Sequence, residues 1–138
     1  MKAPSAGYSG TPLPAKLGIK PGMRFFALGA PSTLDALLAG APEMERLVRV
    51  ADFDFALAFA KSERSVNAAF AKLAPHMVDT GMIWIAWPKK TSEAATDLTE
   101  DVVRRAGLAA KLVDVKVCAI DATWSGLKFV RRLRDRAA

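Results

Sequence analysis

Four apolar runs, at residues 23–30, 53–60, 82–87 and 113–120, alternate with segments of helical periodicity along this chain. Runs that are apolar throughout are typical of strands buried on both faces, and the segments between them are long enough for crossover helices. The alternation therefore predicts an α/β fold in which a mostly parallel sheet is covered by helices on both faces, giving three layers.

Helices are expected at residues 32–40, 62–74 and 91–108, because each segment combines an apolar stripe with residues that favour helix ends. The residues that define these ends are the N-caps and capping-box partners Ser32, Asp35, Ser62, Asp97 and Glu100, and the C-terminal glycine Gly107. The tetrapeptide VDTG, residues 78–81, is expected to turn the chain into the strand at 82–87.

The last connection differs from the others. Only six residues, DATWSG, separate Ile120 from Leu127, and a parallel crossover needs about a dozen or more. The strand at 126–132 should therefore run antiparallel to the strand before it. The expected sheet has about five strands, mostly parallel, and closes with an antiparallel C-terminal hairpin.

The composition fits one domain. The chain has 138 residues, of which 51% are hydrophobic and 25% charged. We expect a single α/β domain over residues 1–138, with a Gly/Pro-rich arm at 1–22 that covers an exposed sheet edge and a basic tail at 133–138. Tyr8, flanked by glycines, could instead lie against a pocket or partner. No run has the pattern of a signal peptide or the length of a membrane span, which predicts a cytoplasmic protein without a membrane partner.

The order of these elements resembles the second half of the class I methyltransferase fold, and LAPHMVDTGMIWIAWPK resembles the helix, turn and strand found there. The resemblance implies a truncated, Rossmann-like methyltransferase fold. It also implies that S-adenosylmethionine does not bind: LGAPSTLDAL has no G-x-G loop after the first strand, and FDFALAFAKS ends in Lys61 where an acid would hold the ribose.

A second resemblance covers nearly the whole chain. The stretches GYSGTPLPAKLGIKPG, WPKKTSEAATDL and AGLAAKLVDVKVCAIDATWSGLKFVRR resemble small bacterial proteins grouped as domain-of-unknown-function family 3052. That family implies no activity, so the function has to be argued from the residues.

Ligands of open parallel sheets bind outside the carboxyl ends of the strands. The polar and aromatic residues expected there form the predicted ligand site: Ser32, Lys61, Ser62, Trp87, Lys89, Lys90, Asp121 and Trp124. The lysines and the two helix N-termini would attract an anion, and the tryptophans would stack on a planar group. The structural alternative is that the tryptophans pack in the core and the lysines are solvated strand ends.

Catalytic and metal sites are not expected. The sequence has one histidine, His76, and one cysteine, Cys118, so a zinc site of the usual ligands is nearly excluded and no catalytic residue is assigned. The favoured function is a non-catalytic domain that binds a small anionic or planar ligand or a protein partner, with no cofactor. The alternatives are a transferase-type enzyme on a degenerate methyltransferase-like scaffold, and a nucleic-acid-binding protein that uses the basic C-terminal tail.

Overall fold

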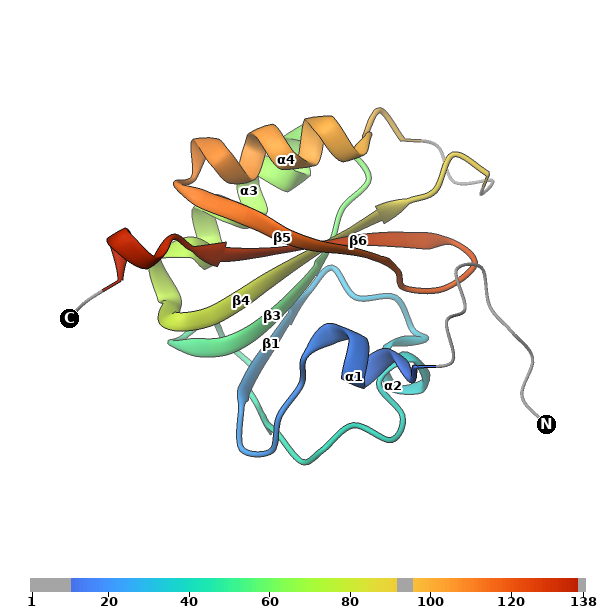
Figure 1. Ribbon diagram of the computed structural model, residues 1–138. Helices are drawn as coiled ribbons and strands as arrows, with labels where there is room; N and C mark the ends of the chain where they lie inside the picture. Colours follow the sequence, from blue (N-terminus) through green and yellow to red (C-terminus); the bar gives the residue numbers. More distant parts are fainter. Residues whose placement is uncertain (1–10, 92–95, 137–138) are drawn as a thin grey trace.

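The protein folds around a six-stranded sheet whose strand order is β2-β1-β3-β4-β6-β5. The computed structural model describes residues 11–91 and 96–136 (Figure 1). The strands are β1 (Arg24–Leu28), β2 (Glu45–Arg46), β3 (Phe53–Phe59), β4 (Met77–Pro88), β5 (Leu112–Ala119) and β6 (Trp124–Arg131). Strands β1 to β4 are mutually parallel, and β6 runs antiparallel to both β4 and β5. The predicted α/β sheet with an antiparallel C-terminal hairpin is confirmed.

Helices cover both faces of the sheet. Figure 1 shows α3 (Glu63–Leu73) and α4 (Glu100–Ala109) on one face and α1 (Leu13–Leu17) and α2 (Leu34–Leu37) on the other. The two 3₁₀ turns are η1 (Ala74–His76) and η2 (Leu133–Asp135). Each face has its own hydrophobic core, one under α3 and α4 and the other under α1 and α2. These are the expected three layers.

Strand β4 contributes to both cores because successive side chains of a strand point to opposite faces. Ile83, Ile85 and Trp87 belong to the core under α3 and α4, whereas Met82 and Trp84 belong to the core under α1. Trp84 is fully buried, and its Nε1 donates a hydrogen bond to the carbonyl oxygen of Leu17 at 3.0 Å. Trp84 is therefore a core residue.

The structure corrects the predicted strands at two places. Strand β2, which pairs in parallel with β1, was not expected, because two residues are too short to produce a pattern. Residues 78–81 were expected to form a turn but lie within β4, where a register shift occurs opposite β3. A Cβ on Gly81 would come within 3.0 Å of the carbonyl oxygens of Asp54 and Val78, so a glycine lets this part of the strand pass close to β3.

Helix ends were predicted less well than strands. α2 has a single turn with Thr33, not Ser32, at its N-cap, and no side chain caps it. α4 begins at Glu100, where the Thr99 side chain accepts a hydrogen bond from the Val102 amide. Gly107 is not a C-terminal glycine: it lies inside α4, against the ring of Phe129. The predicted Ser62 cap of α3 is confirmed.

The described part of the N-terminal arm covers a face of the sheet. Leu17 of α1 is fully buried in the core around Trp84. Tyr8 lies outside the described residues, as does the end of the basic tail, residues 137–138. Among the described residues no helix is long and apolar enough to cross a membrane.

Candidate functional site

The direction of the connections reverses between β1 and β3. From β1 the chain moves to β2 on one side and then returns to β3 on the other, so the carboxyl ends of β1 and β3 form the switch point where open sheets bind ligands. Gly29 follows β1 with a φ of +66°, and a Cβ there would lie 2.8 Å from the carbonyl oxygen of Phe59. The exposed turn of Gly29 and Ala30 thus packs its backbone against the end of β3.

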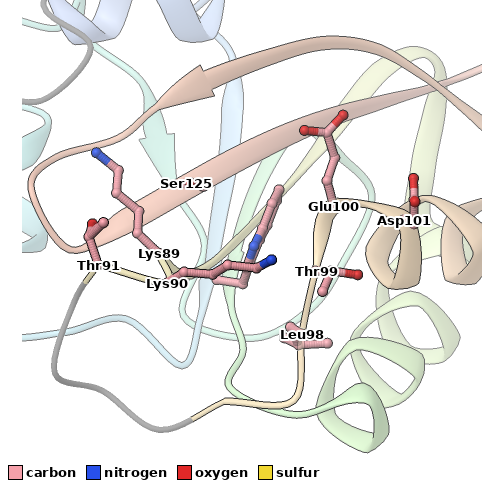
Figure 2. Close-up of a pocket in the computed structure, with 9 residues that line it drawn as sticks. Lys89, Lys90, Thr91, Leu98, Thr99, Glu100, Asp101 and Ser125 are labelled. Carbon is pink, nitrogen blue, oxygen red and sulfur yellow. The ribbon is translucent and has the colours of Figure 1, made fainter.

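A pocket of about 480 Å³ lies at the carboxyl end of β4. Its walls come from the end of β4, the start of β6 and the start of α4, and its lining residues are Trp87, Lys89, Lys90, Thr91, Leu98, Thr99, Glu100, Asp101 and Ser125 (Figure 2). The volume lies within the range of about 300–1,000 Å³ that is usual for small-molecule sites. Figure 2 shows the side chains of Lys89 and Lys90 diverging from the strand end.

Arg104 pairs with three carboxylates, two of which, Glu100 and Asp101, line the α4 side of this pocket. Its guanidinium bonds Asp114 at 2.9 Å and Asp101 at 2.8 Å, and it also bonds Glu100. The hydrogen bonds that Arg104 donates to Asp114 and, with a smaller effect, to Glu100 raise the pKa of the guanidinium above its usual value. The pocket therefore has a cationic side, at Lys89 and Lys90, and an acidic side at Glu100 and Asp101.

The pocket is held by contacts between the two loops that precede α3 and α4. The Thr96 hydroxyl donates to the carbonyl oxygen of Lys61 at 2.7 Å, and the Asp97 carboxylate accepts from the Glu63 amide at 3.0 Å. Asp97 was expected to cap its own helix but caps α3 instead. These two bonds fix the start of α4 beside the end of β3.

The structure brings together only part of the predicted ligand site. Trp87, Lys89 and Lys90 line the pocket. Trp124 lies on the opposite face of the sheet, edge-on to Phe59 with ring centroids 5.0 Å apart, so the two tryptophans do not form one stacking site. Lys61 is exposed and is not part of the pocket lining.

The remaining predicted residues have local structural contacts. Asp121 Oδ1 accepts hydrogen bonds from the Thr123 and Trp124 amides, each at 2.8 Å, which shapes the β5–β6 turn. The Ser62 side chain accepts from the Ser65 amide as the cap of α3, and Asp97 accepts from the Glu63 amide, so two amides at this helix start are already bonded. Ser32 is exposed in the turn before α2.

Several pocket residues were not among those predicted. Ser125 stands opposite Trp87 in the β4–β6 register, and Leu98 and Thr99 precede α4. Ser125 belongs to the short link that the sequence marked as a hairpin, but its position beside Trp87 depends on β6 pairing with β4. No metal-binding group of three or more His, Cys, Asp or Glu residues is present in the described part of the chain.

The sheet, its reversal point and its antiparallel strand define a Rossmann-like fold of the class I methyltransferase type. Ribosomal protein L11 methylase from Lactobacillus delbrueckii subsp. bulgaricus superposes with a TM-score of 0.60 at 12% identity, over 86% of this chain and 74% of that one. Magnesium protoporphyrin IX methyltransferase (ChlM) from Synechocystis PCC 6803 with bound SAM gives 0.56 at 11% identity, over 86% and 74%.

CalO1, a methyltransferase of calicheamicin biosynthesis in its SAH-bound form, gives a TM-score of 0.58 at 11% identity over 87% of this chain. This chain spans about half of CalO1, 52% of its length. No protein-family model and no curated protein matches the sequence, so the resemblance to domain-of-unknown-function family 3052 stays a prediction.

These neighbours correct two expectations. A non-catalytic binding domain was favoured, and S-adenosylmethionine was not expected, because the chain lacks a G-x-G loop. The three structures named above are a methylase and two methyltransferases, and two of the three hold SAM or SAH. The transferase-type alternative is therefore better supported than the reading that was favoured.

The position expected for a ribose-binding acid, at Lys61 after β3, is also wrong. The strand that follows β1 is β2, not β3, so Lys61 does not mark that position. Residues 47–50, which come after β2, are Leu, Val, Arg and Val. A ribose at this point would meet backbone groups, apolar side chains and the exposed Arg49, but no carboxylate from this segment.

Proposed function

We propose that this chain is a transferase-type enzyme that binds S-adenosylmethionine at the switch point between β1 and β3. The observation that carries the proposal is the strand order with its reversal after β1 and its antiparallel β6, which superposes on methyltransferases over most of this chain. When bound, S-adenosylmethionine supplies a methyl group carried on a sulfonium.

The turn after β1 fits a nucleoside ligand. Gly29 and Ala30 are both exposed at the carboxyl end of β1, and neither has a side chain long enough to block the approach of a ligand to the backbone. Gly29 keeps this turn close to β3, since any Cβ at that position would clash with the carbonyl oxygen of Phe59. These residues would hold the cofactor through backbone groups.

The acceptor substrate would occupy the pocket at the end of β4. Trp87 supplies an apolar wall, while Lys89 and Lys90 would bind an anionic group of the acceptor. Arg104 keeps the carboxylates of Glu100 and Asp101 paired at the far wall, so they compete less with the acceptor for the lysines. The proposed acceptor is therefore a small molecule with an apolar or planar part and an anionic group.

Calorimetric titration with S-adenosylmethionine and S-adenosylhomocysteine tests the cofactor. We expect both to bind the wild-type protein and to raise its melting temperature, because a ligand of the native state stabilises that state. Ala30→Leu should weaken binding about tenfold or more by filling the approach to the turn, an effect worth about 1.4 kcal/mol. Ala39→Leu, the same change at another exposed site before Gly40, is the matched control and should bind normally.

Two results would overturn the proposal. One is the absence of a calorimetric signal and of a melting-temperature shift with either compound. The other is binding that Ala30→Leu and Ala39→Leu leave equally strong, which would place the cofactor elsewhere.

A further inference from the structure

Lysines from separate parts of the chain converge on the face of the sheet that α1 covers. Lys116 of β5 and Lys128 of β6 stand directly opposite each other in the antiparallel ladder. Lys116 Nζ donates to the carbonyl oxygen of Lys16 in α1 at 2.8 Å, although the two residues are 100 positions apart. Lys128 Nζ lies 3.4 Å from the position that a Cβ on Gly18 would take. We call Lys16, Lys20, Lys116 and Lys128 the lysine cluster.

A β-bulge in β5 keeps a carboxylate away from this cluster. Asp114 and Lys116 are two residues apart and would share a face in a regular strand. The register shifts between them, so that Asp114 stands opposite Phe129 while Lys116 stands opposite Lys128. The extra residue, Val115, thereby turns Asp114 to the α4 face, where it bonds Arg104 at 2.9 Å. Lys116 stays on the α1 face.

The like charges of the cluster act on one another. Burial lowers the pKa of Lys128 below its usual value, and the charges of Lys116 and Lys20 lower that pKa further. Like charges directly opposite one another in a ladder are destabilising. A bound anion would relieve this repulsion, and a half-buried ammonium group binds an anion more strongly than a fully solvated one.

The cluster borders a cavity of about 330 Å³. The cavity is lined by Lys16 and Lys116, together with Thr11, Ala15 and the β5 residues Val117, Cys118 and Ala119. The Cys118 thiol is not an anionic competitor, because burial raises its pKa in spite of the neighbouring Lys16 and Lys116. Two members of the lysine cluster, Lys16 and Lys116, therefore line this cavity beside a neutral floor, while Lys20 and Lys128 lie outside its lining.

We propose that the lysine cluster binds a phosphate-bearing anion. Several ammonium groups that converge from α1, β5 and β6 match the charge of a diphosphate better than that of a carboxylate. This site is separate from the switch point and from the β4 pocket: its lining residues are shared with neither. It goes beyond the proposed transferase function and does not depend on it.

Calorimetric titration of the full chain with pyrophosphate, at constant ionic strength, tests the site. We expect pyrophosphate to bind the wild-type protein and to bind the variant Lys116→Gln/Lys128→Gln about tenfold more weakly or worse, since each charge-assisted hydrogen bond contributes about that much. Lys72→Gln/Arg105→Gln removes the same charge from exposed positions on α3 and α4 and should bind like the wild type. Removing the repulsion should leave the Lys116→Gln/Lys128→Gln variant folded, which its circular dichroism spectrum would verify.

A short single-stranded RNA titrated in parallel identifies the source of the phosphate. Binding of pyrophosphate that depends on Lys116 and Lys128 supports a site for a free phosphorylated ligand, and binding of the RNA alone with the same dependence supports a nucleic-acid backbone. The proposal fails if neither probe binds, or if both double variants bind each probe equally.

Discussion

At the scale of single residues, Gly29 has the sharpest consequence for stability. Its φ of +66° disfavours other residues, and a Cβ would also meet the carbonyl oxygen of Phe59 at 2.8 Å. Gly40 has a similar φ of +84° but no atom within 4 Å of the corresponding position. Gly40→Ala should therefore lower the free energy of unfolding only by the strain of a left-handed alanine, about 1 kcal/mol. Gly29→Ala should lower it by about 1–3 kcal/mol more, because of the steric clash.

Urea denaturation monitored by circular dichroism would measure both free energies of unfolding. Equal losses in the two variants would contradict the close packing of this turn on β3. Because the same turn forms the proposed cofactor site, Gly29→Ala should also weaken S-adenosylmethionine binding more than Gly40→Ala does.

Residues on regular strands could be placed from the sequence, whereas residues whose position depends on pairing could not. Because successive side chains of a strand alternate, a strand at 82–87 places Trp84 and Trp87 on opposite faces, as the structure has them. Trp124 was expected near Trp87, but it stands opposite Pro88 and faces the other core. The lysine cluster was missed because Lys16 and Lys20 are about 100 positions from Lys116 and Lys128. The bulge at Val115 that separates Asp114 from Lys116 also leaves no trace in the local pattern.

At the scale of elements, the C-terminal turn of α1 is anchored to β4. Trp84 Nε1 donates to the Leu17 carbonyl oxygen, and both side chains are fully buried. Trp84→Phe would leave that carbonyl oxygen without its donor and open a small cavity, for an expected loss of about 2–4 kcal/mol. Trp87→Phe is the matched control. Because Trp87 borders the solvent-accessible pocket, this substitution should lower the free energy of unfolding by only about 1 kcal/mol.

Amide hydrogen exchange would localise the effect. We expect Trp84→Phe to increase exchange in residues 13–19 while β4 stays protected, since the indole bond to Leu17 links α1 to β4. Uniform loss of protection across the sheet would instead mean that Trp84 supports the whole core and not α1 in particular.

Elements were predictable in proportion to their length and regularity. The seven-residue β3 and the eleven-residue α3, with its Ser62 cap, follow from apolar pattern and capping chemistry. β2 is defined by two backbone pairings with β1, and α2 by one turn, so neither has a period to detect. The start of α4 was misplaced because Asp97 bonds the Glu63 amide of another helix rather than its own.

At the scale of the whole molecule, chain connectivity predicted the layers and the hairpin but not the strand order. Six residues between two apolar runs require an antiparallel return, and longer links allow crossovers. That β6 inserts between β4 and β5, and that β2 and β3 lie on opposite sides of β1, depends on long-range pairing. The switch point, and with it the proposed cofactor site, could be located only from that order.

The two cores of the molecule should unfold together, because β4 contributes alternate side chains to both. Single-tryptophan variants report each face separately: Trp87→Phe/Trp124→Phe leaves Trp84 under α1, and Trp84→Phe/Trp124→Phe leaves Trp87 under α3 and α4. In each variant, we expect the fluorescence transition in urea to coincide with the circular dichroism transition of the same variant, as in two-state unfolding. The reason is that β4 cannot lose its pairing with β3 and β6 without disrupting both cores. A fluorescence midpoint of the Trp84 reporter at a lower urea concentration than the circular dichroism midpoint would contradict this and show that the α1 face opens on its own.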